Sequence, residues 1–179
     1  MKKYAANPVG LGVFAGSVLI LLLLEAVYLA LGNFPAAALF LGLIVLYAAF
    51  HVSSLHTVHL SRKGISKHIL GFQSAAYHWS EIREVGVLYP KVTKRLGKNR
   101  RAGQCFIYFS PRKMDSQTRL KACVNWPPKD IIAMTYTPER FRQSVSLWDG
   151  KFVFFNITTR ELFGQDTALF DFDVQEIRY

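Results

Sequence analysis

The stretch over residues 7–31, NPVGLGVFAGSVLILLLLEAVYLAL, decides the fold class of this chain. It opens with Asn7 and Pro8, residue types that favour the N-cap and the first turn of a helix, and its one charged residue is Glu25. At 1.5 Å per residue, a helix over residues 8–31 is long enough for the ~30 Å hydrocarbon core of a bilayer. The stretch therefore predicts a transmembrane helix.

A second apolar run begins after a very short turn. Gly32–Pro35 contains helix-breaking residues, and the chain beyond it predicts a second span over residues 35–57. Because the connection is so short, the second helix must return antiparallel, which makes a hairpin. The first run is longer than the apolar core of a cleaved signal peptide, and no small-residue cleavage site follows it. We therefore expect the hairpin to be retained.

Positive charge flanks the hairpin on one side only. Lys2 and Lys3 precede the first helix, Arg62, Lys63 and Lys67 follow the second, and the turn between the helices has no charge. Loops rich in Lys and Arg stay on the cytoplasmic side. We therefore expect a multi-pass protein of the cell membrane with both termini cytoplasmic.

After residue 57 the apolar residues recur at every second position, which is the period of strands. The predicted strands are residues 59–62, 65–70, 73–79, 85–89, 104–110, 130–136 and 152–157. A short helix is expected within residues 114–124. A second helix starts at Thr137 and Pro138, ends at Asp149-Gly150 and is amphipathic. The pattern predicts a small, mostly antiparallel β-sandwich or barrel closed by one helix.

Five short pieces of this region resemble the bacterial pleckstrin-homology-like (PH-like) domains attached to transmembrane segments, a largely uncharacterised family. These pieces are residues 61–65 (SRKGI), 79–82 (WSEI), 107–110 (IYFS), 136–139 (YTPE) and 147–150 (LWDG). The resemblance implies a bent antiparallel sandwich with one end plugged by the C-terminal helix, in which Trp148 is expected to be the plugging ring. It divides the chain into a hairpin over residues 1–57, a PH-like domain over 58–157 and an extension over 158–179.

The part of the chain from Arg62 onward is strongly basic. It holds 20 Lys and Arg residues and 11 Asp and Glu residues, and so carries +9 of the formal net charge of +10. Six cations and no acid fall within residues 91–101. Beside a membrane, each such cation contributes about 1 kcal/mol of attraction to anionic headgroups, whereas a solvated loop explains the same composition. The predicted headgroup contacts are Arg62, Lys63, Lys91, Lys94, Arg95, Lys98, Arg100 and Arg101.

The sequence shows no motif for catalysis, cofactor binding or metal binding. His56 and His59 have no third ligand in sight, and Cys105 and Cys123 are too few for a disulfide framework. Nucleic acid is disfavoured, because the basic loop lacks interleaved aromatic residues. We expect a non-enzymatic interaction or regulatory module that binds protein partners, its own copies or anionic lipid. The alternative is a subunit or sensor of a membrane complex whose key residue is Glu25, since a carboxyl group within a span is costly.

Overall fold

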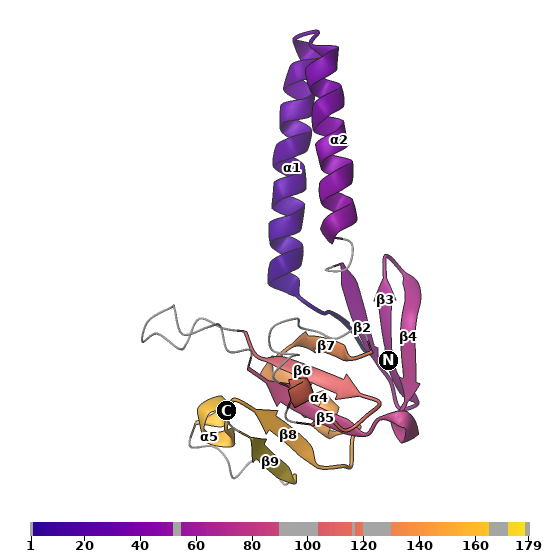
Figure 1. Ribbon diagram of the computed structural model, residues 1–179, viewed down its shortest axis with the longest axis vertical. Coiled ribbons are helices and arrows are strands. Elements are labelled where there is room, and N and C mark those ends of the chain that lie inside the picture. Colours follow the sequence, from indigo (N-terminus) through magenta and orange to yellow (C-terminus); the bar gives the residue numbers. More distant parts are fainter. Residues whose placement is uncertain are drawn as a thin grey trace.

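The computed structural model describes residues 2–51, 55–89, 104–115, 117–119, 130–164 and 172–177. Two antiparallel helices rise from a β domain of two sheets (Figure 1). This confirms the coarse prediction of an N-terminal apolar helix followed by mostly antiparallel sheets and a C-terminal helix.

Helix α1 covers Pro8–Ala30, close to the predicted span. The side chain of Asn7 accepts a hydrogen bond from the Gly10 N–H at 3.0 Å and so caps the helix. The helix is not buried within the chain, and its length and composition suffice to cross a membrane. It is the one helix of the described residues that meets both conditions.

Helix α2 covers Phe34–His51, so the expectation that it continues to residue 57 is wrong. The chain from His56 is already a strand, because its backbone pairs with strands on both sides. Stacked rings join the two helices near each end: Phe14 lies on Tyr47 with ring centroids 5.6 Å apart, and Tyr28 lies on Phe40 at 5.2 Å.

Sheet A has the order β1-β2-β3-β4 and is antiparallel throughout. Its strands are β1 (Lys2–Ala5), β2 (His56–Leu60), β3 (Gly64–Ile69) and β4 (Phe72–His78). Strand β1 precedes α1, yet it pairs with β2, which follows α2. The sequence boundary at residue 57 separates these two strands, and the structure joins them.

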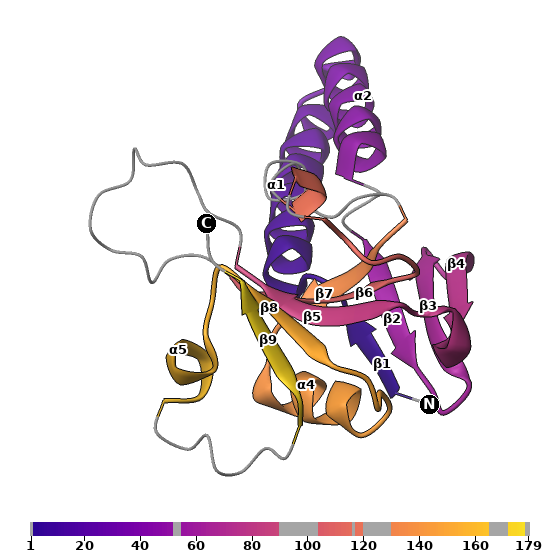
Figure 2. The ribbon, with the colours of Figure 1, turned by 60° about the horizontal axis from the view of Figure 1, so that its bottom comes forward.

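Sheet B has the order β7-β6-β5-β8-β9. Its strands are β5 (Glu84–Leu88), β6 (Phe106–Ser110), β7 (Ile132–Thr135), β8 (Phe152–Phe155) and β9 (Val174–Ile177). Strands β5, β6 and β7 are antiparallel neighbours, whereas β8 pairs with β5 and β9 pairs with β8 in parallel. Parallel neighbours need a crossover, which α4 (Pro138–Val145) and α5 (Thr159–Phe163) provide (Figure 2).

The aromatic core lies where α4 meets sheet B and sheet A. The Phe141 ring is fully buried and lies 5.3 Å from the Phe152 ring, 5.4 Å from that of Phe163 and 5.3 Å from that of Phe172. Phe163 and Phe172 come from the segment after residue 157, which the sequence reading set apart as an extension. Within its described residues, helix α5 and strand β9 of this segment instead belong to the β domain.

Two further expectations concern the helices. Of the short helix expected in residues 114–124, residues 117–119 are helical, and the stretch from 120 lies outside the described residues. The closing helix ends at Val145, earlier than predicted. Trp148 lies beyond its end, half-buried, with its ring 6.5 Å from that of Trp79. Phe141 is therefore the fully buried ring of this helix, and Trp148 packs against the same core from beyond the helix end.

Candidate membrane-proximal site

The joint between α1 and the β domain is held by hydrogen bonds on both sides. The backbone N–H of Ala6 donates to the carbonyl of His56 at 3.0 Å, and the Thr135 N–H donates to the carbonyl of Ala6 at 2.7 Å. Ala6 is 2% exposed, and the next residue, Asn7, caps α1. The start of α1 is thus tied to the strand that follows α2 and also to sheet B.

Strand β1 is further fixed by side chains of α4. The Tyr4 hydroxyl donates to the Gln143 side chain at 2.6 Å, and the Arg140 guanidinium lies 5.1 Å from the centre of the Tyr4 ring. Arg140 also donates to the Thr135 carbonyl at 2.9 Å. An exposed ion pair joins Lys2 to Glu139 at 3.3 Å. Residues 2–6 therefore form one folded unit with α4 and sheet B.

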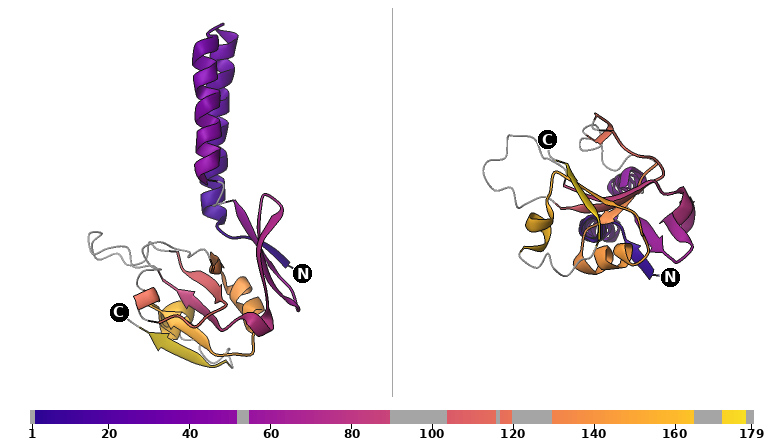
Figure 3. Two further views of the ribbon diagram at one scale, coloured as in Figure 1. Left: turned by 45° about the vertical axis from the view of Figure 1, so that its right-hand side comes forward. Right: turned by 90° about the horizontal axis from the view of Figure 1, so that it is seen from below.

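The turn between β3 and β4 lies at the helix end of sheet A. Ile69 pairs with His56 on one side and with Phe72 on the other, and His56 is the residue bonded to Ala6 at the base of α1. Figure 1 and the left view of Figure 3 show the tip of this β-hairpin rising beside the helix base. The tip of Leu70, Gly71 and Phe72 is thus level with the start of the helices.

The tip is apolar, exposed and conformationally unusual. Leu70 is 62% exposed and Phe72 80% exposed. Leu70 has φ of 50° and Gly71 of 88°, as in the two-residue hairpin turns that favour Asn-Gly. A leucine in the left-handed region costs about 1–2 kcal/mol, and packing within the described chain does not offset that cost. The sequence predicted the turn at Gly71 and placed Leu70 at the end of a strand, whereas Phe72 lay between the turn and the strand predicted from Gln73.

Of the predicted cationic residues, the two that the structure describes, Arg62 and Lys63, do not lie at this end. Arg62 and Lys63 form the turn between β2 and β3, beyond Leu60, which pairs with Lys2 at the end of the sheet remote from the helices. At about 3.4 Å per residue, the strand from Thr57 to Leu60 separates them from the helix base by roughly 10 Å or more. Lys91, Lys94, Arg95, Lys98, Arg100 and Arg101 lie outside the described residues.

Glu25 lies on the side of α1 that faces α2. It is half-exposed and follows Leu21 and precedes Tyr28 at helical spacing, and those two residues lie against α2. No hydrogen bond or ion pair joins Glu25 to another residue of the described ranges. The carboxyl group thus lies at the helix–helix seam among apolar side chains.

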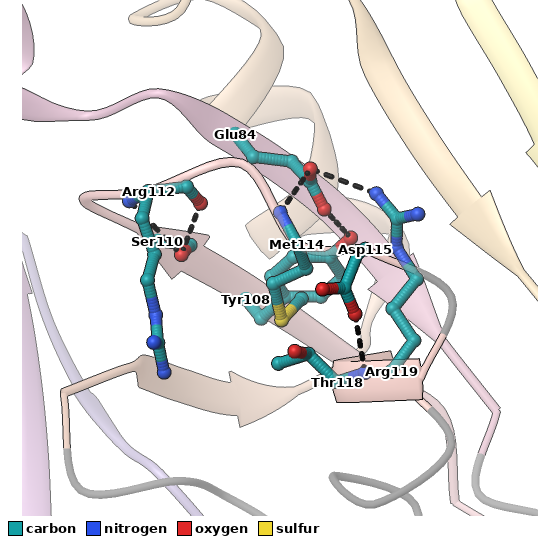
Figure 4. Close-up of polar contacts among 8 residues, drawn as sticks. All are labelled: Glu84, Tyr108, Ser110, Arg112, Met114, Asp115, Thr118 and Arg119. Carbon is teal, nitrogen blue, oxygen red and sulfur yellow. Dashed lines mark hydrogen bonds and ion pairs between the residues drawn. The ribbon is translucent and has the colours of Figure 1, made fainter.

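The sequence reading missed a buried polar cluster on the outer face of sheet B (Figure 4). Glu84 accepts from the Tyr108 hydroxyl at 2.7 Å, from the Met114 N–H at 3.1 Å and from the Arg119 guanidinium at 2.8 Å. Glu84 and Arg119 are 5% and 6% exposed. Burial and the Glu84 carboxylate raise the pKa of Tyr108 well above its ordinary value, so its hydroxyl remains a donor.

Gly86 makes room for this cluster. A Cβ atom at Gly86 would lie 2.1 Å from the Val153 carbonyl oxygen and 2.7 Å from the Tyr108 hydroxyl oxygen. Hydrogen bonds among its members hold the residues after β6 against sheet B, while the Nε of Arg119 is buried without a hydrogen-bond partner among the described residues. The cluster has a structural role, and its one sequence signal was an acid and a glycine within an otherwise apolar strand.

Two histidines stack on the open face of sheet A. The His59 and His68 rings lie 4.0 Å apart between centroids. Burial lowers the pKa of His59, and the nearby His68 and Lys3 lower it further. His56, weighed in the sequence as a partner of His59, instead contacts the Ala133 carbonyl at 3.4 Å. No three His, Cys, Asp or Glu side chains of the described ranges come together as metal ligands.

Cys105 is the one cysteine within the described ranges, and its thiol is free. Burial and, to a smaller degree, Glu161 raise the pKa of that thiol to about 11. The thiolate is the nucleophilic form of cysteine, so little of it is present at neutral pH. Cys105 therefore lacks the activation that a nucleophile needs.

The chain is thus a helical hairpin on a two-sheet β domain. The strand before α1 and the strand after α2 are paired in sheet A. Comparisons of the chain with protein families, curated proteins and solved structures give no match. The PH-like resemblance therefore stays a prediction from the sequence, and function is argued from the residues themselves.

Proposed function

We propose that this chain is a non-enzymatic, membrane-anchored interaction module, in which α1 and α2 cross the membrane as a hairpin and a PH-like β domain lies on the cytoplasmic face. The observation that carries the proposal is the pairing of β1 with β2. These strands flank the two helices in the sequence, so the chain that leaves the domain through α1 must come back to it through α2.

The lengths of the helices fit this arrangement. At 1.5 Å per residue, the 23 residues of α1 extend about 35 Å and the 18 residues of α2 about 27 Å. A bilayer tolerates a difference of a few Å by thinning or by tilt of the helix. If α1 crosses, α2 has to return across the same layer. The uncharged turn around Gly32 then lies on the far side, and Lys2, Lys3, Arg62, Lys63 and Lys67 lie on the cytoplasmic side.

Retention of the hairpin is supported by the contacts of β1. Cleavage after α1 would remove the strand that pairs with β2 and the Tyr4 side chain that bonds to α4. Without β1, strand β2 would become an exposed edge with unpaired backbone groups. The segment that precedes α1 thus completes sheet A, and its removal would destabilise the β domain.

The order of elements supports a PH-like domain. Three antiparallel strands (β2, β3 and β4) are followed by three more (β5, β6 and β7) and then by α4. The parallel strands β8 and β9 depart from the antiparallel sandwich of that family. They extend the second sheet beyond β5 and use the residues after 148 to do so.

The positions of Arg62 and Lys63 favour a protein as the partner of these two residues over lipid headgroups. These residues are remote from the helix base, and at physiological ionic strength charges are screened within about 8 Å. They are positioned to meet a macromolecule that approaches from the cytoplasm. The six cations of residues 91–101 remain candidates for contact with anionic lipid or with the same partner.

A cysteine-labelling experiment on intact cells tests the topology. In a Cys105→Ala/Cys123→Ala background, a cysteine replacing Asn33 should react with a membrane-impermeant maleimide added outside. A cysteine replacing Lys63 should react only after the membrane is opened. External labelling at Lys63, or protection at Asn33 in both conditions, would overturn the proposal. The background chain without new cysteines is the control.

A second candidate function follows from Glu25, which has no polar partner in the described residues and faces the helix seam. In this alternative the hairpin is a subunit or sensor, and Glu25 bonds to another membrane segment. Crosslinking in membranes distinguishes the two: loss of an oligomer in Glu25→Gln, with Ser17→Ala as the control, favours the alternative. An oligomeric state unaffected by Glu25→Gln favours the anchor.

A further inference from the structure

We infer that the tip of the β3–β4 hairpin inserts Leu70 and Phe72 into the interfacial layer of the membrane that α1 and α2 cross. This inference rests on the proposed membrane topology and adds a second point of contact between the β domain and the bilayer. The occupant is the lipid interface itself, beside the helix base.

Exposure separates these two side chains from the rest of the β domain. Among the described residues outside the two helices and their turn, Leu70 and Phe72 are the large apolar side chains that are exposed. Both occur within three consecutive positions. Isolated apolar residues on a surface are ordinary, whereas two neighbours at the end of a projecting β-hairpin form one apolar point.

The register of sheet A fixes the level of this point relative to the helices. Ile69 and Phe72 form the last pair of β3 and β4, and Ile69 also pairs with His56. The His56 carbonyl bonds to Ala6, one residue before the N-cap of α1. The turn of Leu70 and Gly71 projects beyond that pair toward the helices, as Figure 1 and the left view of Figure 3 show.

The chemistry of the surrounding residues suits an anionic interface. Residues 64–78 contain no acid, and Lys67 and His68 precede the tip, with Ile69 between them and Leu70. Aromatic and aliphatic side chains inserted beside cations are the usual composition of segments that lie in the interface. The left-handed Leu70 adds a second observation. Asn is the residue that such a turn favours, so leucine there serves something other than the turn.

A partner protein or a second copy of the chain would also cover apolar residues. The interface is preferred because the joint at Ala6 brings the tip to it without a further binding event. A contact held close by a covalent connection has a high effective concentration. Even two side chains then suffice for stable occupancy.

Depth-dependent fluorescence quenching of the full chain in vesicles tests the inference. Three variants in the Cys105→Ala/Cys123→Ala background each carry one NBD label, at a cysteine replacing Leu21, Gln73 or Lys63. Vesicles of phosphatidylcholine and phosphatidylglycerol contain lipids with a spin label near the headgroup or deep in the acyl chain. The label at Leu21 should be quenched by the deep lipid, that at Gln73 by the shallow lipid, and that at Lys63 by iodide in solution.

Two controls separate the possible failures. Absence of lipid quenching at Leu21 would overturn the proposed topology, whereas quenching at Leu21 without quenching at Gln73 would overturn the inserted tip alone. Leu70→Asn/Phe72→Ser keeps a favoured Asn-Gly turn and removes the apolar point, so the Gln73 label should then lose shallow quenching and become accessible to iodide. If that label instead stays shielded from both quenchers in the parent and dilution of the chain exposes it, a second copy covers the tip and the inference is wrong.

Discussion

Sheets A and B are both built of short strands, but they differ in how many faces they bury. Sheet B is covered on one side by sheet A and α4 and on the other by the residues that follow β6. Strands β5 to β8 are accordingly mostly apolar without alternation, and all residues of β5 and β8 are buried, whereas the outermost strand β9 exposes Gln175 and Glu176. Sheet A buries one face, so β2 alternates between inward Val58 and Leu60 and outward His59. The number of covered faces explains which residues each strand can carry.

This difference also explains where function can be sought. On the outer face of sheet B, the Glu84 carboxylate bonds to Tyr108, Met114 and Arg119, so this carboxylate is used within the fold. The outer face and the helix end of sheet A are open, and they carry the histidine stack and the exposed tip. Three predictions follow from this difference. The expected change in the free energy of unfolding decreases from the doubly covered sheet B to the open sheet A.

The largest effect is expected for Phe141→Ala in the core between α4 and sheet B. The ring is fully buried and is surrounded by other rings, so its removal leaves a cavity and should lower the free energy of unfolding by about 3–5 kcal/mol. Denaturant unfolding of the full chain in detergent, followed by near-ultraviolet circular dichroism, measures it. Arg142→Ala, on the exposed side of the same helix, is the control and should change little. A loss below about 1 kcal/mol at Phe141 would contradict the doubly covered core.

The next effect concerns the outer face of sheet B. Arg119→Met removes the cation from a carboxylate that is 5% exposed and should cost about 3 kcal/mol, because the remaining charge is buried and unpaired. Glu84→Gln/Arg119→Met should cost less than the sum of its two single changes, since neither charge then remains. The same unfolding measurement applies. Strict additivity would show that this face is hydrated and not closed.

The smallest effect is expected on the open face of sheet A. The folded chain holds the pKa of His59 below its ordinary value of 6.5, so the unfolded chain binds the proton more readily. The contribution of His59 to the free energy of unfolding is then fully present above pH 6.5, and it decreases as the pH falls below that value toward the lower pKa of the folded chain. His59→Gln should remove this part of the pH dependence, less than about 1 kcal/mol because the site is open to solvent.

Unfolding of the parent and the His59→Gln chain between pH 8 and pH 5 provides the comparison. The charged groups that face His59 are His68 on β3 and Lys3 on β1. Lys3→Ala retains the stack and should reduce the effect only in part. Identical slopes for the parent and His59→Gln would show that the stack does not oppose protonation.

Much of the fold followed from local patterns. Asn7 and Pro8 marked the start of α1, and Thr137 and Pro138 marked the start of α4, as the structure confirms. Alternation and apolar runs placed strands near β3, β4, β5, β6, β7 and β8, and residues 59–62 were predicted as a strand that overlaps the end of β2. The end of α2 was set too late because His, Ser, Thr and Val residues fit either a helix end or a strand. Only pairing with β1 and β3 decides for the strand.

The candidate site could be predicted less well. Charge drew attention to Arg62 and Lys63, but a sequence does not tell which end of a strand faces the helices. That depends on β1, four residues whose pairing with β2 spans the whole hairpin. Leu70 was predicted as a strand residue and Phe72 was given no role, because the sequence alone does not tell whether an apolar side chain lies in a core or at an exposed tip.

The sequence by itself determined the apolar helix pair, the types of the elements and the helix that closes the core. These depend on residues close together in the chain, through period, capping and turn chemistry. Only the tertiary structure decided the addition of β1 to sheet A, the parallel strands β8 and β9 and the Glu84–Arg119 pair. It also brought the apolar tip to the level of the helix base. Each of these joins residues far apart in sequence, and local periodicity carries no information about which distant strand or charge becomes the partner.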